Sequence, residues 1–191
     1  MKKLIISDKA THVTTLGPGK RFVVWVQGCR KKCKGCTSPE LQSFNGGTEI
    51  SPGALAVIAA YSGNDGITLS GGEPFEQAGA LAELLSELKK LNPSMDVIIY
   101  TGYKYEDLLA ENDADKNALI SMTDLLIDGE YIQSLDDGLS LRGSSNQRVI
   151  PLTDRLKDKT DLYGKPGRKM QLFEVSDYIK YAGIPDKRNN E

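Results

Sequence analysis

The three cysteines of this chain are Cys29, Cys33 and Cys36, which form a C-x3-C-x2-C arrangement. An odd number of closely spaced thiols is a poor disulfide framework, and in a reducing compartment such a group is typical of a metal site. Three thiolates on one short loop can each bind one iron of a [4Fe–4S] cubane, which leaves the fourth iron without a protein ligand. Because an open coordination position is typical of catalytic metals, the spacing predicts a catalytic cluster.

Two other interpretations of the cysteines stay open. The chain has a single histidine, His12, so half a zinc ribbon could be completed by that residue or by ligands from a partner. The three thiols could also be free cysteines that bind no metal. Metal analysis separates these cases, because a cubane gives a brown protein whereas zinc gives a colourless one.

A second stretch suited to ligand binding is Ser70-Gly71-Gly72-Glu73-Pro74, which directly follows an apolar run. Adjacent glycines let the backbone come close to a ligand, and backbone carbonyls together with the Glu73 carboxylate suit an ammonium group. A loop of this composition can equally be an ordinary turn. Similar polar or glycine-rich sequences follow three other apolar runs, namely Gln27-Gly28-Cys29, Thr101-Gly102-Tyr103 and Asp128-Gly129-Glu130-Tyr131.

The elements that must position these loops alternate between strand and helix. Apolar runs rich in β-branched and aromatic residues predict strands at 22–26, 67–69, 97–100, 124–127, 147–150 and 171–175. Helical spacing and capping residues predict helices at 52–61, 81–91, 105–110, 116–122 and 176–181. The alternation is typical of an α/β fold with a parallel sheet, in which the loops after the strands meet at one edge. We therefore expect the distinctive loops to converge on one site.

Length and composition fit a globular protein, with 191 residues, 39% hydrophobic and 26% charged. We expect a core of residues 1–150 and a C-terminal extension of residues 151–191 that packs on it. The extension is rich in lysine and aspartate, with a turn at Gly164-Lys165-Pro166-Gly167. Its last residues, from about 186, are expected to be frayed.

Charge and hydropathy exclude several classes of function. The net charge of −2 gives no reason to expect a nucleic-acid partner. No apolar run approaches the ~20 residues that a membrane span requires, and the N-terminus lacks the apolar region of a signal peptide. We therefore expect a cytoplasmic protein without a membrane partner.

Several short sequences occur along the chain in a fixed order. They are Gly17-Pro18-Gly19-Lys20-Arg21, Trp25-Val26-Gln27-Gly28-Cys29, Cys36-Thr37-Ser38-Pro39-Glu40, Phe44-Asn45-Gly46-Gly47, Ser70-Gly71-Gly72-Glu73-Pro74-Phe75-Glu76-Gln77, Tyr100-Thr101-Gly102-Tyr103, Asp128-Gly129 and Arg142-Gly143-Ser144-Ser145-Asn146-Gln147-Arg148. In these residues the chain resembles the radical S-adenosylmethionine enzymes. Within them it is similar to the activating proteins of anaerobic ribonucleotide reductase and related glycyl-radical-enzyme activases, over about residues 12–150.

The resemblance implies a partial, open parallel β/α barrel that holds one [4Fe–4S] cluster and S-adenosylmethionine. The reduced cluster would pass one electron to the sulfonium, which yields methionine and a 5′-deoxyadenosyl radical. The residues implied for S-adenosylmethionine are Gly71, Gly72 and Glu73 at its amine, Gly35 and Thr37 at its nucleoside, Thr101 and Gly102 at its ribose or carboxylate, and Asn146 in a stretch that would hold adenosine or receive a substrate loop.

Three features depart from the family pattern. Many radical enzymes carry an aromatic residue before the last cysteine, where this chain has Gly35, a residue that the reductase-activase branch also tolerates. The sequence has no second cysteine group, so the extra clusters of larger activases and of many peptide-modifying relatives are not expected. The segment after residue 150 is longer than expected for a minimal reductase activase. This last departure bears on the partner of the protein and not on its chemistry.

The activity implied by the resemblance is hydrogen abstraction from a glycine Cα of a large glycyl radical enzyme, with anaerobic ribonucleotide reductase as the first candidate. Residues Arg30, Lys31, Lys32 and Lys34 would face an acidic electron donor of the flavodoxin or ferredoxin type, or form a merely solvated basic loop. A second hypothesis is a radical enzyme acting on a small molecule or short peptide, with residues 151–191 as a lid or recognition element. A third is a non-catalytic zinc module.

Overall fold

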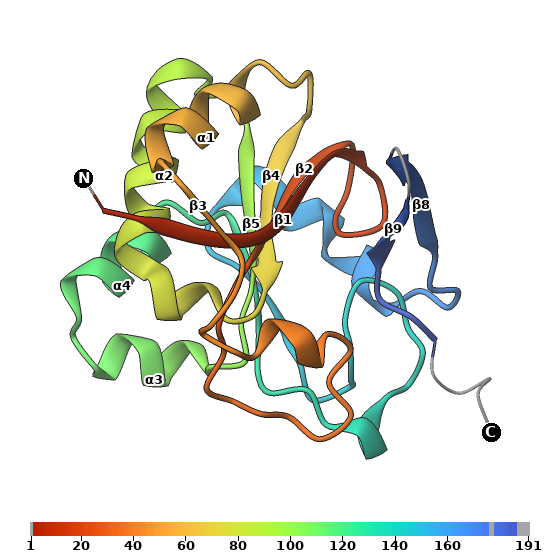
Figure 1. The fold of residues 1–191 in the computed structure, drawn as a ribbon. Coiled ribbons are helices and arrows are strands. Elements are labelled where there is room, and N and C mark those ends of the chain that lie inside the picture. The colour runs from red at the N-terminus through yellow and green to blue at the C-terminus, as the bar shows by residue number, and fades with distance from the viewer. Residues whose placement is uncertain (1, 176–177, 187–191) are drawn as a thin grey trace.

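The chain folds around a seven-stranded sheet with the order β3-β1-β2-β4-β5-β6-β7, beside a two-stranded hairpin of β8 and β9 (Figure 1). The computed structural model describes residues 2–175 and 178–186. The strands are β1 (Leu4–Val13), β2 (Arg21–Val26), β3 (Thr48–Ile50), β4 (Gly66–Gly71), β5 (Asp96–Tyr100), β6 (Leu125–Asp128), β7 (Arg148–Pro151), β8 (Met170–Val175) and β9 (Tyr178–Gly183). The α-helices are α1 (Pro52–Ala60), α2 (Ala78–Leu91), α3 (Tyr105–Ala110) and α4 (Ala114–Ser121), and the short 3-10 helices are η1 (Pro39–Leu41), η2 (Pro74–Gln77), η3 (Gln133–Leu135) and η4 (Asp154–Gly164).

The centre of the sheet is parallel and its margins are antiparallel. Strands β2, β4, β5 and β6 pair in parallel, and helices lie in the connections between them, because a parallel pair requires a crossover. Strands β1, β3 and β7 pair antiparallel with their neighbours. In the described part of the chain β3 and β7 form the two free ends of the sheet, so it does not close into a barrel. The α/β class is confirmed, whereas a purely parallel sheet is not.

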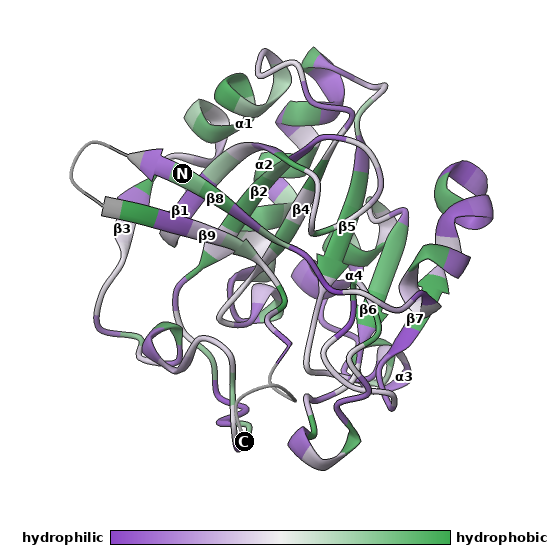
Figure 2. Ribbon diagram, turned by 90° about the vertical axis from the view of Figure 1, so that its right-hand side faces the viewer, coloured by the Kyte–Doolittle hydropathy of each residue, from purple (hydrophilic) through white to green (hydrophobic). Residues whose placement is uncertain are grey.

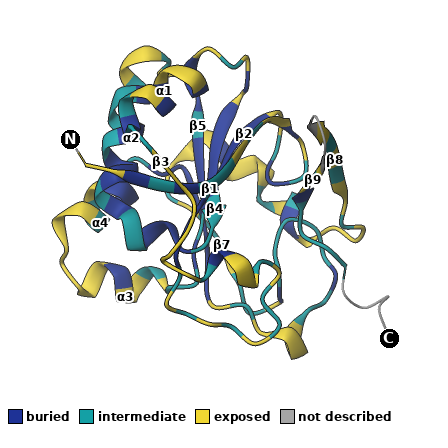
Figure 3. Cartoon of the chain, in the orientation of Figure 1, coloured by how far each residue is buried: buried dark blue, intermediate teal, exposed yellow. Residues whose placement is uncertain are grey.

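The two faces of the sheet are covered by different parts of the chain. Val97 and Ile99 of β5 pack into the core beneath α1, α2 and α4, whereas Ile98 between them packs on the opposite face with Tyr163 of η4. Figures 1 and 2 show the α-helices on one side of the apolar central strands and the C-terminal segment on the other. The buried strands run through the middle of the molecule, and exposed residues gather on the outer helices (Figure 3). One sheet face is therefore available to line a site.

Local sequence explains the two main helices. The Ser51 hydroxyl accepts the Ala54 N–H at 3.5 Å and Pro52 opens the first turn, as expected for α1. In α2, Leu81, Leu84, Leu85 and Leu88 of the predicted leucine stripe are buried, whereas Leu91 at the end of the helix is exposed. The helix begins three residues earlier than predicted, at Ala78. No helix in the described part of the chain is long and apolar enough to cross a membrane.

The helix predicted at 176–181 is wrong for residues 178–181, which belong to β9. Leu172 of β8 pairs with Tyr181, and Gln171 pairs with Ala182. Tyr181 is exposed and Ala182 is buried, which is the period-two pattern of a strand with one covered face. Residues 176 and 177 lie outside the described residues, as do residues 187–191, where most of the predicted frayed end falls.

Strand β1 and helix η4 were not predicted from the sequence. β1 lies near the margin of the sheet, where Leu4 and Ile6 are buried but Lys9 and Thr11 are not, so it lacks the long apolar run of a central strand. Strand β7 spans the expected domain boundary at residue 150 and belongs to the main sheet. The boundary therefore stays an expectation.

The segment after β7 contacts the rest of the protein at several points. The Lys180 ammonium lies 2.7 Å from the Asp8 carboxylate, and the Gln171 amide donates to the His12 carbonyl at 3.0 Å. At the other end of the segment, Arg155 donates to the backbone carbonyls of Pro93, Ser94 and Met95. These contacts hold the segment on the sheet face that the α-helices leave open.

Candidate functional site

The three cysteines lie on the loop that directly follows β2. The loop is held at its start because the Gly28 N–H donates to the Leu41 carbonyl at 2.8 Å and the Cys29 N–H donates to the Gln42 carbonyl at 3.0 Å. A turn brings the Cys36 N–H to the Cys33 carbonyl at 3.2 Å. None of the three cysteines forms a disulfide bond, and all three are partly exposed. The fold thus presents them together at the carboxyl edge of the parallel strands, as the sequence predicts.

The three cysteines line one pocket, which we call the cysteine pocket. The residues that line it come from the loops after β2, β4, β5 and β6, from the segment before β7, and from the residue after β9. They are Cys29, Lys31, Cys33, Cys36, Thr37, Gln42, Ser70, Gly71, Gly72, Glu73, Tyr100, Thr101, Gly102, Gly129, Tyr131, Gly143, Gln147 and Ile184. Nine of the residues predicted to bind the cluster or S-adenosylmethionine lie in this set, namely Cys29, Cys33, Cys36, Thr37, Gly71, Gly72, Glu73, Thr101 and Gly102.

Two predicted residues, Gly35 and Asn146, do not line the cysteine pocket. Gly35 has φ of +72°, and a Cβ at its position would come within 2.6 Å of the Gln133 side chain. The Asn146 amide donates to the Glu130 carbonyl at 2.8 Å. Neither residue lines the pocket, and their assignment to S-adenosylmethionine stays a prediction.

Gly71 and Gly72 are packed directly against the strand that leads to the cysteines. A Cβ on Gly72 would lie 2.3 Å from the Gly28 carbonyl oxygen, and one on Gly71 would lie 2.5 Å from the Val26 nitrogen. Gly71 also has φ of +104°, a conformation that favours glycine. The Glu73 N–H donates to the Gly28 carbonyl at 2.9 Å. The glycine pair thus joins the loop after β4 to the cysteine loop.

Glu73 is a buried acid whose carboxylate accepts three hydrogen bonds. Its Oε1 accepts from the Thr101 hydroxyl at 2.8 Å and from the Phe75 N–H at 3.0 Å, and its Oε2 accepts from the Gly102 N–H at 2.8 Å. Burial raises the pKa of Glu73 to about 7, although these three hydrogen bonds oppose the shift. The carboxylate therefore joins the loops after β4 and β5, and a cation in the pocket would stabilise its ionised form.

The cysteine sulfurs receive backbone N–H groups. The Ser38 N–H donates to Cys36 Sγ at 3.5 Å. The backbone of Tyr131 acts to lower the pKa of Cys33, and the backbone of Lys31 and Lys32 acts to lower the pKa of Cys29. Burial nevertheless raises the pKa of Cys29, and it raises the pKa of Cys33 to about 11. A bound metal would supply the positive charge that these thiolates need.

This donor set fits an iron–sulfur cluster. Hydrogen bonds to sulfur are one of the means by which proteins hold and tune such clusters. In the described part of the chain, no three His, Cys, Asp or Glu side chains are grouped as ligands of a metal ion, whereas in a cubane each thiolate binds a different iron. His12 lies at the opposite end of β2, since its neighbour Val13 pairs with Arg21. A zinc site completed by His12 is therefore wrong.

Several residues of the pocket were not individually assigned to the cluster or to S-adenosylmethionine, although their loops were expected at the site. Tyr131 and Gln147 lie in the loop after β6 and in the stretch before β7, and Tyr100 lies at the end of β5. Their position after strands, or in the 142–148 stretch, was the available signal. Nothing in the sequence connected Ile184, which follows β9, with the cysteines.

Comparisons with known proteins agree with this site. The family model described as a 4Fe–4S single cluster domain matches residues 15–150. Three similar proteins are anaerobic ribonucleoside-triphosphate reductase-activating proteins. The one from Vibrio cholerae is 36% identical over 145 residues, which cover 72% of this chain and 91% of the relative. Those from Enterobacteria phage T4 and Escherichia coli strain K12 are each 32% identical, over 72% and 70% of this chain and 88% and 89% of the relatives.

The fold and the thiol-lined pocket define a protein with a 4Fe–4S single cluster domain. With this degree of identity, the chain belongs to the family of anaerobic ribonucleoside-triphosphate reductase-activating proteins. The resemblance inferred from the sequence motifs is thereby confirmed.

Proposed function

We propose that this protein is a radical S-adenosylmethionine activase. It binds one [4Fe–4S] cluster through Cys29, Cys33 and Cys36, reductively cleaves S-adenosylmethionine, and generates a glycyl radical on anaerobic ribonucleotide reductase. The observation that carries the proposal is the shared pocket, in which three thiols on one loop face the loop that contains Glu73. The partner is inferred from the names of the relatives.

The cluster and S-adenosylmethionine would supply the radical chemistry, whereas the protein binds and orients them. When bound and reduced, the cluster supplies one electron to the sulfonium of S-adenosylmethionine, which breaks a C–S bond to give methionine and a 5′-deoxyadenosyl radical. Glu73 supplies negative charge for the substrate ammonium group. Hydrogen bonds from Thr101 and Gly102 keep its carboxylate in place, so the charge is oriented before the substrate arrives.

We also propose that the sheet is an open, partial β/α barrel of the radical S-adenosylmethionine type. Its four parallel strands carry the pocket at their carboxyl ends, and its free edge strands leave a gap in the wall. A protein loop carrying the target glycine can approach a pocket of this kind. Hydrogen abstraction from a glycine Cα would then proceed without release of the radical.

We propose an electron donor of the flavodoxin or ferredoxin type, with an acidic surface. Lys32 and Lys34 are exposed beside the cysteines, and their charge would attract such a donor. Arg30 is also exposed but pairs with the buried Glu76 carboxylate, and the Lys31 ammonium lies 4.0 Å from the centre of the Tyr103 ring. We propose a cytoplasmic location because three closely spaced cysteines outside any disulfide and a reduced donor require a reducing compartment.

The test uses the full chain, reconstituted anaerobically with iron and sulfide and reduced with dithionite. With S-adenosylmethionine it should form 5′-deoxyadenosine, and Cys33→Ala should form none. Absence of product despite four bound irons, or zinc in place of iron, would overturn the radical chemistry.

A second arm adds anaerobic ribonucleotide reductase and records electron paramagnetic resonance. The expected result is a glycyl radical signal that depends on both S-adenosylmethionine and the activase. Cleavage of S-adenosylmethionine without a glycyl radical on any partner would refute the activase assignment and leave the small-molecule or peptide hypothesis.

A further inference from the structure

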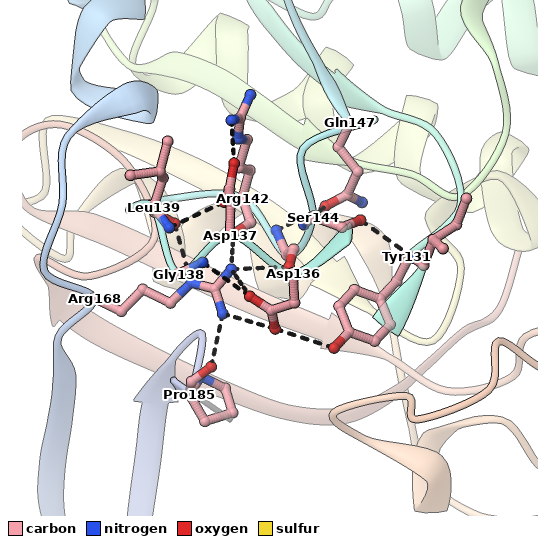
Figure 4. Close-up of polar contacts among 12 residues, drawn as sticks. Tyr131, Asp136, Asp137, Gly138, Leu139, Arg142, Ser144, Gln147, Arg168 and Pro185 are labelled. Carbon is pink, nitrogen blue, oxygen red and sulfur yellow. Dashed lines mark hydrogen bonds and ion pairs between the residues drawn. The ribbon is translucent and has the colours of Figure 1, made fainter. Parts of the chain in front are cut away.

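Arg168, in the segment after η4, has a buried side chain that is 2% exposed and lies at the centre of a polar cluster (Figure 4). Its guanidinium is 2.8 Å from the carboxylate of Asp136, which is itself 7% exposed. The remaining donors bind backbone carbonyls, those of Leu139 at 3.0 Å, Pro185 at 2.9 Å, Arg142 at 2.8 Å and Gly143 at 2.8 Å. One side chain of the C-terminal segment thus holds both the turn at 136–143 and the residue after Ile184.

The Asp136 carboxylate connects this cluster to the cysteine pocket. It accepts the Tyr131 hydroxyl at 3.1 Å and the Gly138 N–H at 3.0 Å. Tyr131 and Cys33 both line the pocket. A continuous set of hydrogen bonds therefore leads from Arg168 through Asp136 to Tyr131 in the wall of the pocket that holds the thiols.

The turn held by Arg168 also forms another part of the pocket wall. Gly143 donates its N–H to the Gln147 side chain at 2.7 Å, while its carbonyl accepts from Arg168. The Gln147 amide in turn donates to the Gly129 carbonyl at 2.9 Å. Gly143, Gln147 and Gly129 all line the pocket. The wall opposite the cysteine loop is therefore a hydrogen-bonded unit anchored on Arg168.

The arrangement requires an arginine. Five N–H donors in a planar fork can reach carbonyls in several directions while also pairing with a carboxylate, whereas a lysine has three donors at one point. A buried guanidinium without such partners would be strongly destabilising. The cluster is thus built around this side chain and does not result from incidental surface contacts.

We propose that Arg168 is a positioning residue for the cysteine pocket: it fixes the wall formed by Tyr131, Gly143 and Ile184, and so sets the affinity for S-adenosylmethionine. The inference rests on the proposed function for the identity of the ligand. It assigns the C-terminal segment a role in completing the site, although the matched family domain ends at residue 150.

The first measurement uses the full chain without cluster and reads hydrogen exchange of backbone amides. Arg168→Gln should speed exchange in residues 131–147 about tenfold or more, and leave β4 and β5 unchanged. Arg168→Lys, which keeps a charge beside Asp136, should act in the same direction with a smaller effect. The matched control is Arg155→Gln. Arg155 also binds three backbone carbonyls, but these precede β5 and lie at the end of that strand away from the cysteine pocket. Unchanged exchange in 131–147 would overturn the proposal.

The second measurement uses the reconstituted enzyme. Arg168→Lys should raise the KM for S-adenosylmethionine about tenfold, the scale expected for a supporting contact, with kcat within about twofold. Tyr131→Phe, which removes only the hydroxyl bound to Asp136, should raise KM less. A fall in kcat with KM unchanged would contradict the proposal. Failure of the wild type to cleave S-adenosylmethionine would refute the proposed function instead, and the exchange measurement would still judge the role of Arg168 in the wall.

Discussion

The Glu73 carboxylate and the backbone of Gly102 are joined by a hydrogen bond of 2.8 Å, so the loops after β4 and β5 meet at a buried acid. Burial raises the pKa of Glu73 from 4.5 to about 7 in the folded protein. The folded state therefore binds this proton more tightly than the unfolded state. The stabilisation from the proton is complete below pH 4.5 and is lost as the pH rises through 7.

Glu73→Gln should remove this pH dependence. The difference in unfolding free energy between wild type and variant should change by about 3 kcal/mol from pH 4.5 to 8, with the wild type losing stability as the pH rises. Urea denaturation of the protein without cluster, followed by circular dichroism at several pH values, measures it. Parallel curves for the two proteins would show that Glu73 does not titrate in this range.

Gly72→Ala should destabilise the protein and impair cluster binding, because its Cβ would meet the Gly28 carbonyl oxygen at 2.3 Å. We expect a loss of about 2 kcal/mol or more together with reduced iron content after reconstitution. Gly53→Ala in α1 is the matched control, since its nearest neighbour would be 3.9 Å away. That helical position should be unaffected or stabilised by up to about 1 kcal/mol. Equal effects of the two substitutions would contradict the packing argument.

Arg148→Met should cost about 3 kcal/mol, because it leaves the Asp128 carboxylate buried without its cationic partner. The same guanidinium also binds Glu106 at 2.7 Å, but that carboxylate is exposed. Glu106→Gln should therefore shift the thermal midpoint much less than Arg148→Met. Differential scanning calorimetry of both variants checks this ranking, and a larger effect of the Glu106 substitution would reverse it.

Replacing Lys32 and Lys34 together by glutamine should slow reduction by a flavodoxin-type donor. Arg30 is left in place because it pairs with the buried Glu76 carboxylate. The two exposed lysines steer an acidic partner, so the rate should fall about tenfold at low salt and the salt dependence should flatten. Cleavage of S-adenosylmethionine with dithionite should remain near the wild-type rate. A double variant that loses both activities equally would indicate damage to the cysteine loop and no role in docking.

The sequence predicted the central strands, the main helices and nine of the pocket residues because these depend on local patterns. Apolar runs determine β2, β4 and β5, and glycine or cysteine directly follows them at the edge where the site forms. Gly71 and Gly72 were expected to let a ligand come close to the backbone. The structure shows a second requirement for glycine, because a side chain at Gly72 would collide with Gly28.

Long-range contacts account for what the sequence did not predict. Ile184 reaches the pocket only because the hairpin of β8 and β9 packs on the open sheet face, and β9 is a strand only because it pairs with β8. The buried pair of Arg168 and Asp136 joins residues 32 positions apart. No periodicity or motif marks such a pair, so only the folded chain identifies it.

The backbone hydrogen bonds that tie Gly28 to Leu41 and to Glu73 have a consequence for the maintenance of the protein. They assemble the cysteine loop and its neighbour from the polypeptide alone, in contrast to small metal-dependent domains that unfold when the metal leaves. Loss of the cluster through damage by oxygen should therefore leave the protein folded. Removal of iron by a chelator should not abolish the cooperative thermal transition. The cluster should therefore be restored by incubation with iron and sulfide after exposure to air, without synthesis of a new chain.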